Sequence, residues 1–278
     1  MKSVLEVLQS TSAYFAKAGV ESPRLNIEHL LAHVLGLPKR MDLYLAFDRP
    51  LSELELAPLR ALVRRRAQGE PLQHLLGTVE FHGRTFRTDA RALIPRPETE
   101  LLAEKILARF STPPPRILDV GTGSGILALT LAAQWPEAEV HAVDISEAAL
   151  SLAKENAASL QLDSRVTFHH GSLMTAVSGV FACIVANLPY VPTGEMASLS
   201  REVQRDPALA LEGGPDGTDL IRPLLLAARA HLQGLLALEI GHAQSAPLAE
   251  ALAAAGYRDI SQESDYNHRN RFLFATYG

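Results

Sequence analysis

The chain has 278 residues, of which 47% are hydrophobic and 21% are charged, and this globular composition excludes a mostly disordered chain. The length allows two domains, and the net charge of −5 disfavours a strongly basic nucleic-acid binder. The single cysteine, Cys183, excludes an intramolecular disulfide and a CxxC zinc site and fits a reducing compartment.

Helical patterns fill the first part of the chain. Apolar residues recur at helical spacing over Val4–Phe15 and Ile27–Leu35, and Gly36 and Pro38 end the second run. A third helix is predicted over Ser52–Gln68, with acidic residues in its first turn and three arginines in its last, an order that matches the helix dipole. We therefore predict that residues 1–76 form a small helical bundle used for recognition or support.

A β-hairpin is predicted directly after these helices. Thr78–Phe81 and Arg84–Arg87 have strand-like composition and flank a His-Gly turn. We expect the hairpin to lie in a linker over residues 77–95, followed by a second domain over residues 96–278.

Strand-like and helix-like segments alternate from Arg116 onward, which indicates βαβ units, a parallel sheet and an α/β, Rossmann-like fold. The predicted strands are Ile117–Val120, Val140–Val143, Val166–Phe168, Ala182–Ala186, Leu235–Ile240 and, at the end of the chain, Arg271–Thr276. The predicted helices are Ile126–Gln134, Ser146–Leu160, Leu220–Leu232 and Ala246–Ala255.

A glycine-rich loop follows the first of these strands. Gly121, Gly123 and Gly125 let the backbone turn sharply and approach a ligand, and the helix after them directs free N–H groups toward the loop. Asp144 ends the second strand, where a carboxylate can accept both hydroxyls of a ribose. The pattern therefore predicts a site for an adenosine-type ligand at the carboxyl ends of the strands.

The G-x-G-x-G spacing after Asp119 differs from the G-x-G-x-x-G spacing of dinucleotide-binding folds. It resembles motif I of class I S-adenosylmethionine methyltransferases. The resemblance implies that the loop, including Thr122 and Ser124, wraps the methionine end of S-adenosylmethionine and that Asp144 holds the ribose.

A second motif, Asn187-Leu188-Pro189-Tyr190, follows the fourth strand. Pro189 restricts Leu188 to extended geometry, so the Asn187 side-chain oxygen and the Leu188 carbonyl are two acceptors that can grip a planar –NH2 group. The Tyr190 ring can pack against that group. Such a site suits methylation of an amide or amine nitrogen, with catalysis mostly by proximity and orientation.

The motif resembles the Asn-Pro-Pro-Tyr motif of amino-methyltransferases, and the rest of the chain is similar to the HemK/PrmC family. The similar segments are Arg66–Pro71, Leu93–Glu100, Glu202–Gly217, Glu239–Gly241 and Asp265–Arg271. The resemblance implies a two-domain enzyme that uses S-adenosylmethionine to methylate the side-chain amide (N5) of the glutamine in the Gly-Gly-Gln loop of peptide chain release factors. It also suggests that Arg96 and Glu98 shape the wall near the transferred methyl group.

Two positions depart from the family pattern. Leu188 stands where a proline is usual, which keeps the backbone carbonyl but removes one rigid ring. The segment His170–Leu173 lacks the acid that usually meets the adenine amino group, so Ser172 is the remaining candidate for that contact.

Two other functions stay open. Asn-Leu-Pro-Tyr also occurs in ribosomal RNA adenine N6-methyltransferases, but these place the helical domain last and usually carry a basic surface. A non-catalytic sensor of an adenosine ligand could use the same fold. The order of the domains and the net charge of −5 argue against the first, and the intact Asn187–Tyr190 loop argues against the second.

Other residues carry weaker signals. His29 and His33 have a spacing that metal ligands use, but no third ligand is near in sequence, so we predict no metal site. We interpret Arg64–Arg66 as a solvated helix end and Cys183 as a buried apolar residue.

The resemblance implies release factors as partners and no requirement for nucleic acid, and we expect a monomer. Met1–Glu6 has no export-signal pattern, and Pro223–Ile240, the longest apolar stretch, contains Arg229 and His231. We therefore expect no membrane span and a cytoplasmic protein.

Overall fold

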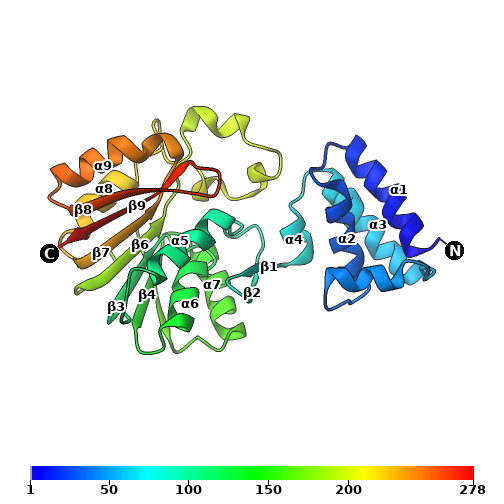
Figure 1. Ribbon diagram of the computed structural model, residues 1–278, viewed down its shortest axis with the longest axis horizontal. Coiled ribbons are helices and arrows are strands. Elements are labelled where there is room, and N and C mark those ends of the chain that lie inside the picture. Colours follow the sequence, from blue (N-terminus) through cyan, green and yellow to red (C-terminus); the bar gives the residue numbers. More distant parts are fainter. Residues whose placement is uncertain (1) are drawn as a thin grey trace. The chain divides into compact units, whose positions relative to one another are not determined.

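The computed structural model describes residues 2–278. These residues form two compact units. The helical unit comprises residues 2–78 together with Ser200–Arg205, and the α/β unit comprises Val79–Leu199 and Asp206–Gly278 (Figure 1).

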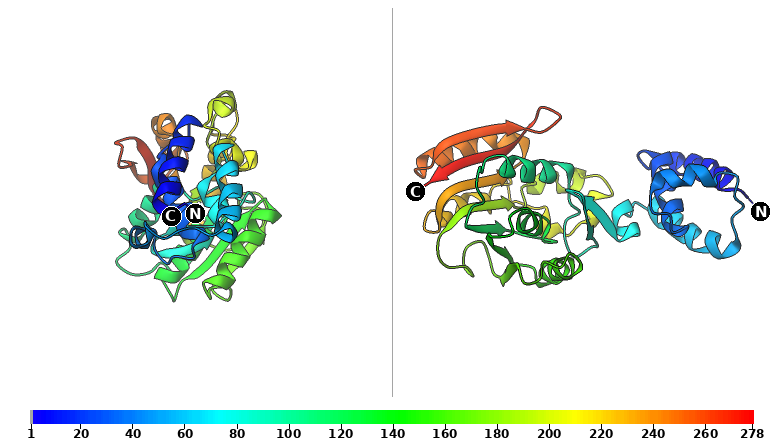
Figure 2. Two further views of the ribbon diagram at one scale, coloured as in Figure 1. Left: turned by 90° about the vertical axis from the view of Figure 1, so that its right-hand side faces the viewer. Right: turned by 60° about the horizontal axis from the view of Figure 1, so that its bottom comes forward.

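The helices of the helical unit lie around one apolar core. Figure 2 shows these helices grouped together. Its helices are α1 (Val4–Lys17), α2 (Pro23–Val34), α3 (Glu53–Ala67), the short α4 (Leu72–Leu76) and the 3-10 helix η1 (Arg40–Ala46). The three predicted helices correspond to α1, α2 and α3. Ser52 caps α3 in a capping box with Glu55, whose carboxylate accepts the Ser52 N–H at 2.8 Å.

Arg66 differs from the predicted solvated helix end. Its side chain is buried, and its Nε donates to Asn26 Oδ1 at 2.6 Å. Its other nitrogens reach the Glu70 carbonyl and the Glu202 carboxylate. A guanidinium has five donors, so it can join α2, α3 and residue 202 within the helical unit at once.

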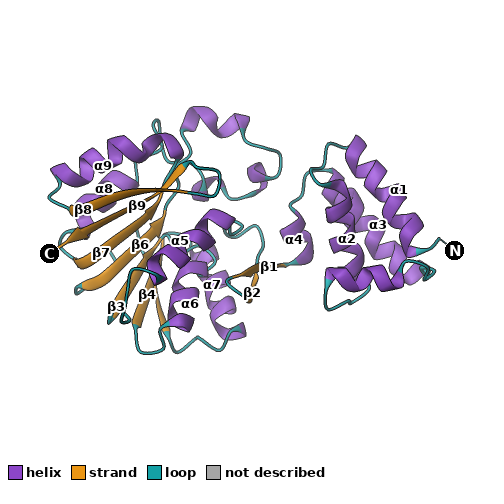
Figure 3. Cartoon of the chain, in the orientation of Figure 1, coloured by secondary structure: helices purple, strands orange, loops and turns teal. Residues whose placement is uncertain are grey.

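The α/β unit contains a hairpin, a seven-stranded sheet and five helices (Figure 3). The hairpin strands are β1 (Thr78–Phe81) and β2 (Arg84–Arg87). The sheet strands are β3 (Arg116–Val120), β4 (Glu139–Asp144), β5 (Val166–His170), β6 (Phe181–Asn187), β7 (Leu232–Glu239), β8 (Arg258–Ser264) and β9 (Asn270–Tyr277). The helices are α5 (Pro97–Leu107), α6 (Ile126–Gln134), α7 (Glu147–Ser159), α8 (Ile221–Ala228) and α9 (Ser245–Ala254), with short 3-10 turns η2 (Thr193–Ser198), η3 (Val203–Arg205, which belongs to the helical unit), η4 (Ala208–Ala210) and η5 (His242–Gln244).

The sheet has the order β5-β4-β3-β6-β7-β9-β8. The first five of these strands are parallel, whereas β9 runs antiparallel between β7 and β8. One core packs α5, α6 and α7 against the sheet together with Phe81 and Phe86 of the hairpin, and the other packs α8 and α9 against the opposite face. The predicted α/β, Rossmann-like fold with an N-terminal helical bundle is confirmed.

The prediction differs from the structure at three elements. It missed helix α5 and strand β8, and it placed the end of one helix wrongly. The segment expected to be helical up to Leu232 ends at Ala228, and Leu232 already pairs with Phe181 in the sheet. Apolar runs of this length suit a buried helix or a buried strand equally well, and pairing with β6 decides between them.

Candidate active site

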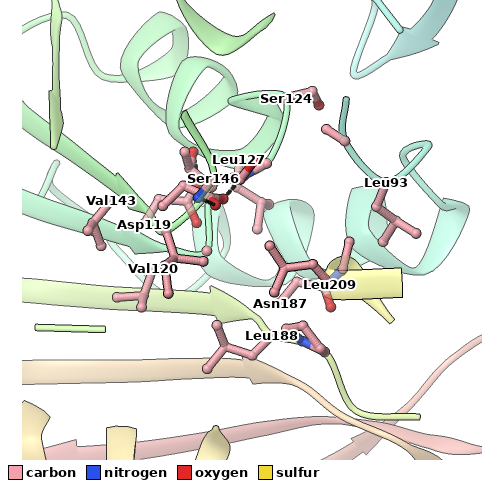
Figure 4. Close-up of a pocket in the computed structure, with 18 of the residues that line it drawn as sticks. Leu93, Asp119, Val120, Ser124, Leu127, Val143, Ser146, Asn187, Leu188 and Leu209 are labelled. Atoms are coloured by element: carbon pink, nitrogen blue, oxygen red, sulfur yellow. Dashed lines mark hydrogen bonds between the residues drawn. The ribbon is translucent and has the colours of Figure 1, made fainter. Parts of the chain in front are cut away.

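The strand order reverses at β3, which has β4 on one side and β6 on the other. In open α/β sheets, ligands bind in the crevice that such a reversal opens at the carboxyl ends of the strands. A cavity of about 180 Å³ lies there, lined by the loops after β3, β4, β5 and β6 and by Pro207, Leu209 and Ala210. Figure 4 shows Asp119, Val143 and Asn187 gathered around it from three strands.

Most of the predicted site residues line this one cavity. They are Gly121, Thr122, Gly123, Ser124, Asp144, Ser172, Asn187, Leu188 and Pro189. Two predicted residues do not line it. Gly125 is the N-cap of α6, with φ of 82°, and Tyr190 packs against the apolar core beneath the loop.

The glycine-rich loop makes close contact with the loop after β6. Gly121 has φ of 74°, and a β-carbon added there would lie 2.8 Å from Leu188 Cδ2. Gly123 also has positive φ, and its N–H donates to Asp144 Oδ2 at 2.8 Å. A side chain at either glycine would therefore strain the backbone, and a side chain at Gly121 would also press against Leu188.

The Asp144 carboxylate is held in place on both sides. Its Oδ2 accepts the Gly123 N–H, and its Oδ1 accepts the Ser146 N–H at 2.8 Å. Ser146 in turn caps α7. Each carboxylate oxygen can accept a further hydrogen bond, so Asp144 can still receive two hydroxyl groups from a ligand in the cavity.

Asp119 is a buried carboxyl group at the end of β3 that also lines the cavity. Its Oδ2 accepts the Thr122 hydroxyl at 2.6 Å and the Ala128 N–H at 3.1 Å, whereas its Oδ1 has no partner within residues 2–278. Burial raises the pKa of Asp119 to about 7, and the nearby Asp144 charge acts in the same direction. The buried unpartnered oxygen offers a bound ligand an acceptor.

The Asn187 side chain is held from behind by a chain of hydrogen bonds. Its Nδ2 donates to Thr99 Oγ1 at 3.0 Å, and the Thr99 hydroxyl donates to Glu239 Oε2 at 2.7 Å. The Tyr190 hydroxyl donates to Glu239 Oε1 at 3.3 Å. Neither the Asn187 Oδ1 nor the Leu188 carbonyl accepts a hydrogen bond in the part of the chain that the structure describes, so both acceptors are available.

Thr99 and Glu239 were not predicted to have a role in the site. Both lie in segments that resemble the HemK/PrmC family, which is the signal that could have found them. Burial raises the pKa of Glu239 to about 7. Burial also raises the pKa of Tyr190, with the Glu239 charge acting in the same direction, so the phenol stays protonated and remains a donor.

A glycine-rich segment after residue 212 supports the backbone of the Asn187–Tyr190 loop. Val191 N–H donates to the Leu211 carbonyl at 2.9 Å, and Gly213 N–H donates back to the Val191 carbonyl at 2.8 Å. A β-carbon on Gly213 would lie 2.6 Å from the Pro189 carbonyl oxygen. This close approach explains why glycine stands there.

Arg96 and Glu98, suggested as wall residues, do not line the cavity. Arg96 instead pairs with the fully buried Asp206 carboxylate at 2.6 Å, and Asp206 also accepts the Ile94 N–H at 3.3 Å. These bonds join residues 94–96 to the segment that supplies Pro207 and residues 209–210 to the cavity wall.

The remaining candidates lie elsewhere. Cys183 is buried within β6, and burial raises its thiol pKa to about 12, so the thiol remains protonated. Among residues 2–278 there is no group of three or more His, Cys, Asp or Glu side chains that could hold a metal ion. Within the same residues, no helix is both long and apolar enough to cross a membrane.

Comparisons with known proteins identify similar families and a similar fold. Residues 6–77 match the family described as PrmC N-terminal domain, and residues 97–212 match the family described as methyltransferase small domain. A methyltransferase structure from Pyrococcus furiosus is 19% identical, with a TM-score of 0.52, over 69% of this chain and 88% of that one, a likeness that shows the fold alone.

Two relatives match over almost their whole length. The chain is 41% identical to the release factor glutamine methyltransferase of Chlorobaculum tepidum, over 98% of this chain and 96% of that protein. It is 44% identical to the release factor glutamine methyltransferase of Deinococcus radiodurans, over 97% of each chain. At this identity and coverage, the chain belongs to the release factor glutamine methyltransferase family.

Proposed function

We propose that the chain transfers a methyl group from S-adenosylmethionine to the side-chain amide nitrogen (N5) of the glutamine in the Gly-Gly-Gln motif of peptide chain release factors. The observation that carries this proposal is the pair of available acceptors, Asn187 Oδ1 and the Leu188 carbonyl, on the wall of the cavity that the glycine-rich loop and Asp144 also line. The names of the relatives support the choice of substrate.

The residues around the cavity fit S-adenosylmethionine. Gly121 and Gly123 leave room for close approach, and the Asp144 carboxylate can accept the ribose hydroxyls. Ser172 lines the same cavity and is our candidate for contact with the adenine end. The Asp119 Oδ1, which has no partner within residues 2–278, can interact with positive charge at the methionine end of S-adenosylmethionine. S-adenosylmethionine, when bound, supplies an electrophilic methyl group.

The chain's own residues orient the acceptor. Asn187 Oδ1 and the Leu188 carbonyl each accept one N–H of the substrate amide, which holds the –NH2 group in a fixed plane. Pro189 and Tyr190 shape the slot, Pro189 from the wall and Tyr190 from below the loop. Catalysis then comes mainly from proximity and orientation. No strong base is required, because the methylated amide nitrogen becomes acidic and loses its proton to water.

We further propose that residues 1–76 recognise the release factor, that residues 77–95 link this domain to the methyltransferase domain over residues 96–278, and that the enzyme is a monomer. The match of residues 6–77 to the PrmC N-terminal domain supports the first assignment. Release factors as substrates imply a cytoplasmic enzyme that needs no nucleic acid.

To test this function, the purified enzyme and methyl-labelled S-adenosylmethionine are incubated with a release factor and, in parallel, with ribosomal RNA. We expect label on the release factor and none on RNA, and replacement of the motif glutamine should abolish the labelling. Label on RNA alone would instead support an adenine N6-methyltransferase.

A further inference from the structure

Glu239 lies behind the candidate active site without lining it. Its side chain is buried, with an exposed fraction of 2%, and it does not belong to the cavity wall. Its side chain reaches the site through hydrogen bonds to Thr99, which is 3% exposed, and to the Tyr190 hydroxyl. The Glu239 side chain can therefore act on the reaction through these two side chains.

The donors and acceptors of this chain of hydrogen bonds can be assigned from their chemistry. An ionised carboxylate only accepts, so the Thr99 hydroxyl must give its single hydrogen to Glu239. The Thr99 oxygen is then only an acceptor toward Asn187, so the Asn187 group that faces it must be the –NH2. The amide oxygen must consequently face the other way.

We infer that Glu239, acting through Thr99, is a positioning residue that sets the orientation of the Asn187 amide and so presents its oxygen to the substrate –NH2 group. This inference rests on the proposed function. The orientation of the Asn187 amide matters because the substrate amide that receives the methyl group presents two N–H donors. Reversed, the Asn187 amide would present its own –NH2 to the substrate, donor against donor.

A consequence is that the proton on Glu239 acts as a switch. Burial raises the pKa of Glu239 to about 7; the Glu98 charge raises it too, whereas the Thr99 and Tyr190 hydroxyls and Arg271 lower it. A protonated Glu239 can donate to Thr99, which frees the Thr99 hydrogen to turn toward Asn187 and allows the reversed amide. Activity governed by this orientation should therefore fall as the pH drops below about 7.

The variants Thr99→Val, Thr99→Ser and Glu239→Gln separate this role from simple packing. Valine keeps the shape of threonine without its hydroxyl, serine keeps the hydroxyl, and glutamine keeps an acceptor oxygen that does not titrate. Thr130→Val is the matched control, because Thr130 is fully buried in α6 and its hydroxyl has no partner within residues 2–278.

Steady-state methylation of the release factor is measured against pH, together with the dissociation constant of S-adenosylmethionine. We expect Thr99→Val to lower kcat/KM for the release factor by roughly tenfold to a hundredfold, the scale of a lost buried hydrogen bond, with cofactor affinity unchanged. Thr99→Ser should restore most of the activity, and Thr130→Val should match wild type. Wild type should lose kcat/KM below about pH 7, and Glu239→Gln should lose this pH dependence.

Wild-type kcat/KM in Thr99→Val, no recovery in Thr99→Ser, or an unchanged pH profile in Glu239→Gln would overturn the inference. The Asn187 side-chain –NH2 resonance, assigned by its absence in Asn187→Asp, gives a readout that needs no substrate. Its hydrogens should exchange with water at least about tenfold faster in Thr99→Val than in wild type, and equal rates would also overturn the inference. A wild-type enzyme that does not label release factors would instead refute the proposed function, and the exchange measurement would still test the orientation of Asn187.

Discussion

Gly121 and Leu188 belong to loops from neighbouring strands, and a β-carbon on Gly121 would lie only 2.8 Å from Leu188 Cδ2. Leu188 is itself buried, so it has little room to move away. The loop implied to hold the cofactor and the loop proposed to hold the substrate amide are therefore mechanically coupled at this contact. A change at either residue should affect both halves of the site.

Gly121→Ala should destabilise the α/β unit and weaken binding of S-adenosylmethionine. The positive φ alone costs roughly 1–2 kcal/mol for a residue with a β-carbon, and the overlap with Leu188 should add about 1–3 kcal/mol. Gly83→Ala is the control, because Gly83 lies in the same unit, has φ of 70° and has open space around its β-carbon. Urea unfolding and cofactor titration measure both effects. Equal losses in the two variants would contradict the proposed clash.

Asp144→Ala should weaken binding of S-adenosylmethionine by at least about tenfold, because hydrogen bonds to a charged group are worth roughly 1.5–3 kcal/mol. It also removes the acceptor of the Gly123 and Ser146 N–H groups. Asp163→Ala, at an exposed position before β5, should leave the affinity unchanged. Isothermal titration calorimetry provides the measurement. An unaltered dissociation constant in Asp144→Ala would refute the ribose assignment.

Asn187→Asp should lower turnover on the release factor by about a hundredfold or more while cofactor affinity is largely kept. The new carboxylate has no hydrogen to give Thr99, and its charge lies near the buried Glu239. Single-turnover methylation with labelled cofactor measures the loss of rate. Turnover equal to wild type would show that the Asn187 amide does not position the substrate.

The stability of the ligand-free protein should decrease with pH through Asp119. Its pKa is raised from 3.8 to about 7 by burial, so the folded chain binds more protons than the unfolded chain between these values. The stabilisation is complete below about pH 4 and is lost as the pH rises through 7.

Asp119→Asn should remove this dependence. Between about pH 5 and pH 8, the wild type should lose on the order of a few kcal/mol relative to the variant. Glu239 titrates in both proteins, so the difference isolates Asp119. Urea unfolding at the two pH values measures the free energies. Parallel changes in wild type and variant would exclude Asp119 as the source.

Much of the fold could be predicted because its signals are local. Helix α3 has a helical pattern and a capping box formed by Ser52 and Glu55. Glycines within one short stretch around Gly121 predict the turn between a strand and a helix. Strand β8 could not be predicted in the same way. Its exposed and half-buried residues lack a clear alternation, and β9 separates it from β7 in the sheet. The place of β8 in the sheet depends on long-range strand pairing rather than on local propensity.

The sequence alone was enough to predict the candidate site residues, because Gly121–Gly125, Asp144 and Asn187–Tyr190 each follow or end a recognisable strand. Parallel strands bring such ends to one edge of the sheet. The orientation of Asn187, in contrast, depends on contacts that form only in the folded chain. Thr99 lies in the first turn of α5, far upstream, and Glu239 ends β7, far downstream. The hydrogen bonds that join Asn187, Thr99 and Glu239 depend on how α5 packs against the sheet. No local sequence pattern predicts that packing.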